Sequence, residues 1–179
     1  MRFSLYEHAA GVETEAGNNV VYDVGRGEAR FGAVGVNGRV LVWELGGDRD
    51  KALLSVEVEL DPAVPWLARC DRIEFPAGAV AYRHAHPGPG MLYLLYGELH
   101  VDGPEVLSRT LRPGEAWFHA PGYPVLATAG QSGETAFVRV QILPAEWKGR
   151  RSIHYLDPAD EDKPKLQRPT ILLEQPIAR

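Results

Sequence analysis

The sequence predicts an all-β protein, either a sandwich or a barrel. Glycine (19 residues) and proline (14 residues) recur along the 179-residue chain and separate short apolar runs. Such punctuation is typical of turns between strands. The run from Ser55 to Leu60 alternates polar and apolar side chains, the pattern of a strand with one face in water. No stretch shows the apolar period of a long helix, so we expect many short strands.

The expected strands follow one another closely from residue 40 onward. Residues 1–30 are rich in glycine and glutamate and carry only weak strand signals. After them, apolar runs bounded by turn residues predict strands at Val40–Leu45, Leu53–Leu60, Ala68–Phe75, Val80–His86, Met91–Tyr96, Glu98–Val101, Val106–Leu111, Ala116–Ala120, Pro124–Thr128 and Thr135–Leu143. A short helical turn is expected at Pro144–Trp147.

The C-terminal part has a different composition. Residues 156–170 are charged and interrupted by prolines, which predicts a solvated loop or arm. Thr170–Glu174 then has the pattern of one last strand. An apolar strand after a polar arm docks on a sheet edge, either its own or that of a partner subunit. We therefore expect a single domain over residues 1–179 that forms a homodimer.

The composition of the chain indicates which kinds of partner it can bind and in which compartment we expect it. Hydrophobic residues make up 45% and charged residues 24% of the chain, as in ordinary soluble globular proteins. The net charge is −5 without a basic block, so nucleic acid is not an expected partner. Cys70 is the single cysteine, which excludes an intrachain disulfide and a thiolate metal cage. The first residues turn polar too early for a signal peptide, and no apolar run has membrane-spanning length, so we expect a cytoplasmic protein that does not bind membranes.

Two histidines in one predicted strand are the first candidates for a functional site. His84 and His86 lie at positions i and i+2 of an apolar segment between Gly78 and Gly97. In a strand these positions point to the same face, so both imidazoles project together. A pair of imidazoles is a plausible start of a metal site, although two ligands bind a metal weakly.

The spacing around these histidines resembles a known family. Gly78-x5-His84-x-His86-x10-Gly97 resembles the first motif of the cupins, and Pro113-Gly114-Glu115-x4-Ala120-Pro121-Gly122 resembles the second. The resemblance covers roughly residues 70–143. It implies an antiparallel double-sheet jelly-roll barrel of the RmlC-like kind. The cupin core would span about 66–143, with N-terminal strands in 1–65 and a C-terminal arm in 144–179.

The resemblance also implies a divalent metal, which could be Fe, Mn, Zn, Ni or Cu. In cupins the metal is commonly bound by the two histidines and a glutamate of the first motif and by a histidine of the second. Here the glutamate position is Gly90 and the second-motif histidine position is Val125. Two of the four expected ligands are therefore missing, and metal binding is expected to be weak or absent unless another group contributes.

His119 could supply a third metal ligand, depending on the turn that follows it. If residues 121–123 form a three-residue hairpin loop, residue 119 faces residue 125 and shares its face. If residues 122–123 form a two-residue loop, residue 120 faces residue 125 and His119 points the other way. The sequence leaves both alternatives open.

Tyr82 and Arg139 are the candidate catalytic residues. By strict alternation Tyr82 shares a face with His84 and His86, where its hydroxyl could bind a substrate or simply pack. Arg139 lies in the last core strand on a face that could line the barrel. A buried arginine needs a partner, which could be a substrate carboxylate or a structural carboxylate of the chain.

Two classes of function remain. The first is a metal-dependent enzyme, of the dioxygenase, isomerase or decarboxylase class, that acts on a small anionic organic molecule. The second is a barrel that binds or senses a small molecule without chemistry, and the missing ligands favour it. A metal-free reaction on a sugar nucleotide would need a carboxylate partner for a histidine base, and none is evident near His84 in the sequence.

Overall fold

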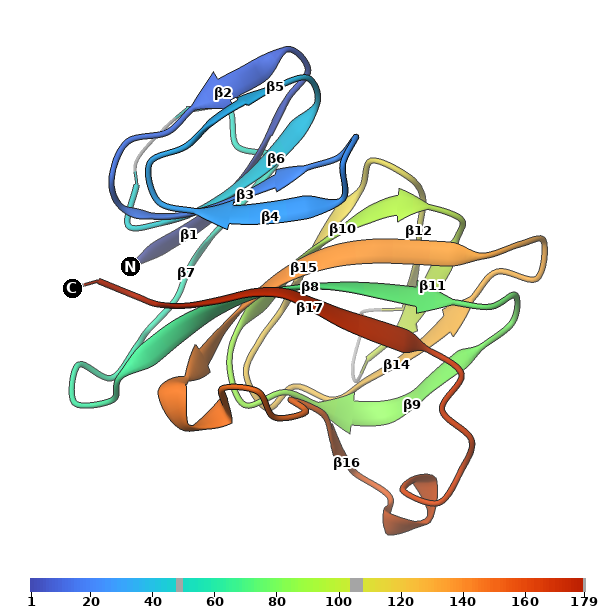
Figure 1. Ribbon diagram of the computed structural model, residues 1–179. Helices are drawn as coiled ribbons and strands as arrows, with labels where there is room; N and C mark the ends of the chain where they lie inside the picture. Colours follow the sequence, from blue (N-terminus) through green and yellow to red (C-terminus); the bar gives the residue numbers. More distant parts are fainter. Residues whose placement is uncertain (48–49, 104–107, 179) are drawn as a thin grey trace. The chain divides into compact units, whose positions relative to one another are not determined.

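The computed structural model of the protein describes residues 1–47, 50–103 and 108–178. It is 54% strand and 3% helix, so the predicted all-β class is confirmed. The strand pairs whose register is described are antiparallel, and Figure 1 shows how the strands follow one another along the chain. Within these residues no helix is long and apolar enough to cross a membrane.

The described strands form three five-stranded sheets and one two-stranded sheet. The first sheet has the order β4 (Glu28–Phe31), β3 (Asn18–Asp23), β6 (Val40–Leu45), β1 (Arg2–His8), β7 (Leu54–Glu57). The second has the order β13 (Ala116–His119), β10 (Gly90–Tyr96), β15 (Thr135–Pro144), β8 (Trp66–Phe75), β17 (Arg168–Pro176). The third has the order β12 (Arg109–Leu111), β11 (Leu99–Asp102), β14 (Val125–Ala129), β9 (Val80–Ala85), β16 (His154–Tyr155), and β2 (Gly11–Glu13) pairs with β5 (Gly35–Asn37).

The chain divides into two compact units. The first unit contains residues 1–70, 140–148 and those from 171 on, and the second contains residues 71–139 and 149–170. The long strands β8, β15 and β17 contribute residues to both. The expectation of a single domain stays a prediction, and each unit is described by itself below.

In the first unit β1 lies between β6 and β7 of its sheet. Four consecutive residues of β1, from Phe3 to Tyr6, are buried, so both faces of the strand are covered. A strand that is buried on both faces shows no alternation of apolar and polar residues. This explains why β1 itself gives only a weak strand signal in the sequence.

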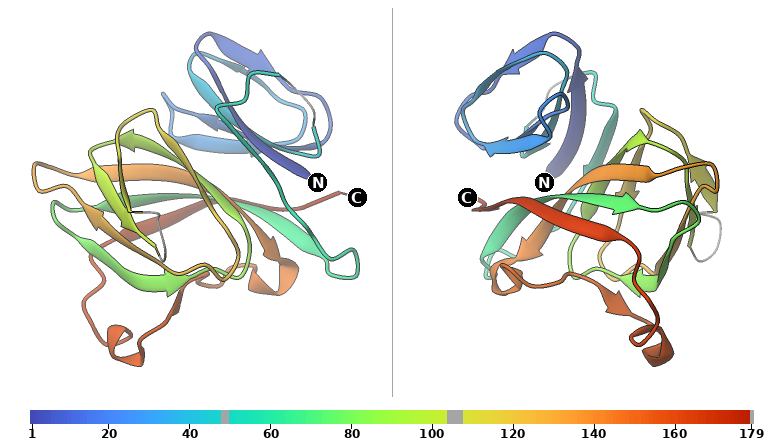
Figure 2. Two further views of the ribbon diagram at one scale, coloured as in Figure 1. Left: turned by 180° about the vertical axis from the view of Figure 1, so that it is seen from behind. Right: turned by 45° about the vertical axis from the view of Figure 1, so that its right-hand side comes forward.

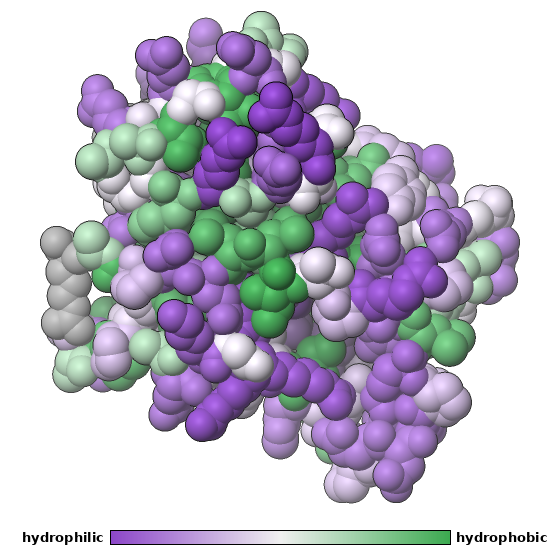
Figure 3. Space-filling view, viewed as in Figure 1, coloured by the Kyte–Doolittle hydropathy of each residue, from purple (hydrophilic) through white to green (hydrophobic). Residues whose placement is uncertain are grey.

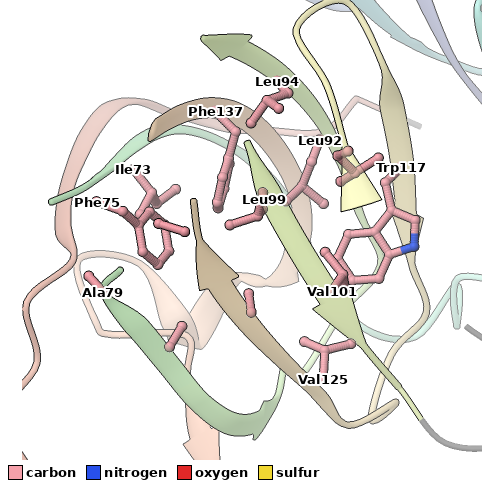
Figure 4. Close-up of a cluster of buried hydrophobic side chains, with 14 residues drawn as sticks. Ile73, Phe75, Ala79, Leu92, Leu94, Leu99, Val101, Trp117, Val125 and Phe137 are labelled. Carbon is pink, nitrogen blue, oxygen red and sulfur yellow. The ribbon is translucent and has the colours of Figure 1, made fainter. Parts of the chain in front are cut away.

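The second unit encloses an apolar core between two sheets (Figure 4). The second sheet contributes Phe75 and Phe137, whose ring centroids lie 5.9 Å apart, and the third sheet contributes Leu99 and Val101. Each such side chain stabilises the fold by about 1.5–3 kcal/mol when it is fully buried. The alternation of β11, with Leu99 and Val101 buried and His100 exposed, is what directs these residues to the core.

Gly97, which closes the first motif, is required by the backbone at that point. Its φ is +81°, in the region that side chains rarely adopt. A Cβ added there would lie 2.4 Å from Oγ1 of Thr135 and 2.6 Å from the carbonyl oxygen of Glu134. The turn that ends β10 therefore admits only glycine without a shift of β15.

The C-terminal residues return to the sheet of their own chain. β17 is the last strand in the order of the second sheet and lies beside β8, as Figure 2 also shows. The amide of Ile177 donates to the carbonyl oxygen of Trp66 at 3.0 Å. The predicted final strand and the helical turn, seen as a 3-10 helix at Ala145–Trp147, are thus present. Of the strand expected at Val106–Leu111, residues 106 and 107 lie outside the described residues, and β12 begins at Arg109.

Candidate functional site: a buried histidine cluster

An extra residue in β9 determines which of its side chains point inward. Val125 of β14 pairs with His84, and Ala127 pairs with Ala81. Two steps along β14 thus match three steps along β9, which defines a β-bulge. Ala81 and His84 are both buried although they differ in parity. The strict alternation assumed from the sequence therefore fails between these two residues.

The three histidines predicted as metal ligands lie together in the second unit. His84 belongs to β9, His86 follows it, and His119 ends β13. The ring centroid of His86 lies 4.9 Å from that of His84 and 4.8 Å from that of His119, and the last two are 6.4 Å apart. Their exposed fractions are 6% for His84 and 2% for the other two. Whether they bind a metal stays a prediction.

His119 reaches this cluster by a route that neither hairpin alternative described. β13 pairs with β10, where His119 faces Gly90, whereas β14 pairs with β9 and β11 in the third sheet. The assumption that residues 119 and 125 sit on paired strands of one hairpin was wrong, because the turn at 120–124 passes from one sheet to another. The Trp117 ring stacks on the His119 ring with centroids 5.4 Å apart.

Each imidazole donates a hydrogen bond to a backbone carbonyl. Nδ1 of His84 donates to Tyr82 at 2.6 Å, and Nδ1 of His86 donates to Ser152 at 2.5 Å. Nε2 of His119 donates to Tyr123 at 2.6 Å. Because a carbonyl oxygen only accepts, the bonded nitrogen carries the hydrogen in each ring. The lone pair therefore lies on Nε2 of His84, Nε2 of His86 and Nδ1 of His119.

The three histidines are neutral at pH 7. Burial lowers the pKa of His84 and of His119 from 6.5 to about 4 in each case. Burial also lowers the pKa of His86 well below its usual value, and the nearby Arg139 charge acts in the same direction. Neutral imidazoles accept hydrogen bonds at the nitrogen without hydrogen, so the cluster presents acceptors.

Arg139 is bound to a carboxylate of the chain itself. Its Nε and Nη2 donate to the two oxygens of Asp71 at 3.0 and 2.6 Å, and its Nη1 donates to Nε2 of His86 at 2.9 Å. Of the two partners considered for Arg139, the structure shows the internal carboxylate. Asp71 was missed in the sequence, although its parity with Ile73 and Phe75 of β8 places it on the buried face.

Tyr82 points away from the three imidazoles. Its ring lies under the ammonium groups of Lys163 and Lys165, which are 4.9 and 5.8 Å from its centroid. The bulge is the physical reason, because it separates the parity of Tyr82 from that of His84. The backbone carbonyl of Tyr82, in contrast, accepts the hydrogen bond from His84. The catalytic role assigned to Tyr82 remains untested, as does that of Arg139.

Two residues of the predicted C-terminal arm (144–179), which precede its expected solvated part at 156–170, contribute to the cluster. Tyr155 of β16 pairs with His84, and their ring centroids are 6.3 Å apart. Ser152 provides the carbonyl that His86 binds. The sequence held no signal for these contacts, because two-residue strands and carbonyl acceptors leave no pattern of residue types. The surface of the later part, near η2 (Pro158–Asp160), is hydrophilic, as Figure 3 shows at lower right.

A divalent metal does not fit the three imidazoles in this arrangement. A metal ion needs the lone pair on Nε2 of His86, which accepts a hydrogen bond from the Arg139 cation. A guanidinium at this distance also repels a divalent cation. Over the described residues no group of three His, Cys, Asp or Glu side chains is arranged to hold a metal ion.

An apolar pocket of about 480 Å³ belongs to the first unit instead. It is lined by residues of β8, of the 3-10 turn after β15, and of β17, namely Pro65, Trp66, Leu67, Ala145, Lys148, Glu174, Gln175, Pro176 and Ile177. None of the residues predicted for the site belongs to it. We place the candidate site at the histidine cluster, where the buried polar groups converge.

Comparison with known proteins gives cupins among the solved structures. An RmlC-like cupin from Shewanella frigidimarina is 25% identical over 44% of this chain and 68% of its own, with a TM-score of 0.39. The polyketide cyclase RemF from Streptomyces resistomycificus is 20% identical over 54% of this chain and 64% of its own, with a TM-score of 0.41. A cupin 2 conserved barrel domain protein from Leptotrichia buccalis is 13% identical over 78% and 82%, with a TM-score of 0.45. No protein-family model matches the chain, and no curated protein matches it.

The motif residues occupy their expected places in an antiparallel double-sheet barrel. His84 and His86 project into it, Gly97 closes the turn after β10, and Gly114 ends the loop before β13 with a φ of +92°. This is the arrangement that the resemblance to the two cupin motifs predicted from the sequence.

Proposed function

We propose that the second unit is a binding barrel for a small organic molecule that carries hydroxyl or N–H groups, and that it works without a resident divalent metal. The observation that carries this proposal is a pair of acceptor nitrogens on two buried histidines. Within the described part of the chain, Nε2 of His84 and Nδ1 of His119 make no hydrogen bond, and neither belongs to the fully buried polar atoms that lack a partner. Both nitrogens therefore keep some accessible surface, and we propose that a ligand donor takes the place of water there.

The surroundings of the two acceptors favour a small ligand. The ring centroids of His84 and His119 are 6.4 Å apart, so two donors of one small molecule can reach both rings. Trp117 and Tyr155 provide aromatic walls beside them. Such a lining, apolar with a few polar groups, is typical of small-molecule sites. Because Asp71 compensates the charge of Arg139, the aromatic walls rather than a charge define the favoured ligands, which are aromatic molecules with hydroxyl donors such as phenols.

Thermal unfolding with catechol and salicylate as probes tests the proposal. A probe that binds only the folded state raises Tm, and the rise continues with the logarithm of the probe concentration above its Kd. We expect a dose-dependent rise for the wild-type protein and none for His84→Leu, which removes one acceptor at similar volume. Arg83→Leu is the matched control, because Arg83 is the neighbouring residue and its side chain binds Asp102 instead. Equal shifts in the His84 and Arg83 variants, or no shift with any donor probe, would overturn the proposal.

The second candidate is the metal-dependent enzyme predicted from the sequence. The hydrogen bonds from the three imidazoles to backbone carbonyls favour it, because metal-ligating histidines commonly hold their other nitrogen in this way. Repletion of untagged protein with Fe(II), Mn(II), Ni(II) or Zn(II), followed by metal analysis, separates the two candidates. Near-stoichiometric metal that is lost in His84→Ala with the fold intact would establish the metal site and refute the metal-free proposal.

We also infer that the protein forms a homodimer through β17. β17 ends the order of its sheet, and its residues are mostly exposed, including Ile171. An edge strand offers unpaired backbone groups to a second chain. Removal of residues 157–179 should then lower the mass found by light scattering to that of one chain. An unchanged mass would count against pairing through this edge.

A further inference from the structure

The apolar pocket of the first unit is a second place where the protein can bind a small molecule. Its volume of about 480 Å³ lies in the range of small-molecule sites. The Trp66 ring in its wall is held in place, because the indole nitrogen donates to the carbonyl oxygen of Asp61 at 2.9 Å. Pro176 and Ile177, at the end of β17, supply further apolar wall. An apolar group that enters this pocket is therefore removed from water on several sides.

Hydrogen bonds to the walls fix the shape of this pocket. The amide of Ala145 donates to the carbonyl oxygen of Pro65 at 2.8 Å, which ties the 3-10 helix to the start of β8. Behind Ile177, the backbone of Ala178 exchanges two hydrogen bonds of 2.8 Å with the side chain of Asn18 in β3. A pocket that is formed before its ligand arrives loses little conformational freedom on binding.

The two charged residues of the lining differ in their partners. The Glu174 carboxylate binds the buried guanidinium of Arg69 at 2.6 Å, so its charge is compensated. Lys148 follows the 3-10 helix and is exposed, and over the described residues its ammonium makes neither a hydrogen bond nor an ion pair. The pocket thus offers a ligand apolar walls and one uncompensated positive charge.

We propose that this pocket binds a small amphipathic anion, with an apolar body of one or two rings and one acidic group such as a carboxylate or a sulfonate. The body packs against Trp66 and Ile177, and the acidic group pairs with the ammonium of Lys148. An exposed ion pair adds little affinity, so burial of the rings supplies most of the binding free energy, and Lys148 selects for anions. The pocket shares no residue with the histidine cluster, so this inference goes beyond the proposed function and does not depend on it.

Two fluorescent probes that differ in one charge test the proposal. Anilinonaphthalene sulfonate is anionic, and phenylnaphthylamine has the same rings without the sulfonate. The wild-type protein should bind one molecule of either probe per chain. Lys148→Glu should weaken the sulfonate about fivefold, because a repulsion replaces an exposed ion pair, and should leave the neutral probe unchanged. Arg26→Glu is the matched control, because it makes the same change of charge on an exposed residue outside the lining.

Variants of the wall show whether the probes occupy this pocket. Ala145→Trp should abolish binding of both probes by filling the space. If that variant does not fold, Ile177→Asp replaces it, because the amide of residue 177 still donates to the Trp66 carbonyl while the lost apolar wall should weaken both probes about tenfold. His84→Leu should bind both probes like the wild type.

Four results would overturn the inference. They are no binding of either probe by the wild type, equal effects of Lys148→Glu and Arg26→Glu on the sulfonate, unchanged binding in the folded wall variants, and loss of binding in His84→Leu. The effect of His84→Leu on catechol reports the histidine cluster alone, so any failure here leaves the proposed function to be judged by its own experiment.

Discussion

Two arginine–aspartate pairs of nearly equal length allow the effect of burial on stability to be measured. Arg139 and Asp71 approach to 2.6 Å, and Arg83 and Asp102 approach to 2.7 Å. The side chains of the first pair are 8% and 4% exposed, and those of the second are 37% and 41% exposed. If distance alone decided, the two pairs would contribute equally to the free energy of unfolding. Because water solvates the charges of the exposed pair and not those of the buried pair, we expect unequal effects when one partner is removed.

The expected magnitudes follow from the charge left behind. Asp71→Ala leaves the Arg139 cation buried without a carboxylate, and we expect it to lower the free energy of unfolding by about 3–5 kcal/mol. Asp102→Ala leaves Arg83 in contact with water, and we expect a loss of about 0.2–1 kcal/mol. Replacing both Asp71 and Arg139 by leucine should recover most of the larger loss, because no buried charge remains.

Urea unfolding followed by circular dichroism measures these free energies, with the slope of each transition confirming that the variants unfold from a comparable native state. The two single variants should differ by about 3 kcal/mol. Equal losses for Asp71→Ala and Asp102→Ala, or a double leucine variant no more stable than Asp71→Ala, would refute the reasoning.

Three further predictions concern pH, a turn and the C-terminal segment. Burial lowers the pKa of His84 and of His119 from 6.5 to about 4, so between these two pH values the unfolded chain binds more protons than the folded chain. As the pH falls from 6.5 to 4, the free energy of unfolding should therefore fall by up to about 1.4 kcal/mol per pH unit for each histidine, and a urea midpoint that does not change with pH would contradict this. Gly97→Ala should lower the free energy of unfolding by more than about 2 kcal/mol, because the added Cβ would collide with Thr135. Gly122→Ala, with a φ of +68° and open space around it, should lower it by about 1 kcal/mol, and similar losses of Tm in the two variants would argue against the collision at Gly97. Lys165 donates to the backbone carbonyl oxygens of Asp160, Glu161 and Lys163. Lys165→Gln should therefore speed amide hydrogen exchange in residues 160–165 about tenfold, and unchanged exchange would show that these hydrogen bonds do not stabilise the segment.

The sequence predicted the barrel well because its strands alternate or are bounded by clear turn residues. β6 was predicted with its observed bounds, and β10 and β15 to within one residue at each end. The N-terminal strands expected in 1–65 were given no bounds before residue 40. β1 is buried on both faces, with Ser4 among its buried residues, and so lacks a regular alternation. The cytoplasmic location and the homodimer remain predictions.

The histidines of the site could be found from spacing, but their partners could not. His84, His86 and His119 were singled out by the motif and its neighbourhood. The route of His119 required knowledge of which sheet β14 joins, and that depends on contacts distant in sequence. Ser152 acts through a carbonyl that every residue has, so its identity carries no signal. Asp71 was visible in the alternation of β8 and was overlooked.

The bulge in β9 bears on how this chain should be compared with its evolutionary relatives. Because one residue of β9 has no counterpart on β14, losing a residue at Tyr82 or Arg83 would restore plain alternation and leave Ala81 and His84 on the same face. Natural selection can therefore shorten this stretch by one residue without turning the imidazoles outward, whereas the same deletion between His84 and His86 would separate the pair. An alignment that insists on five residues between Gly78 and His84 would overlook such relatives, and one anchored on the pairing of His84 with Val125 would retain them.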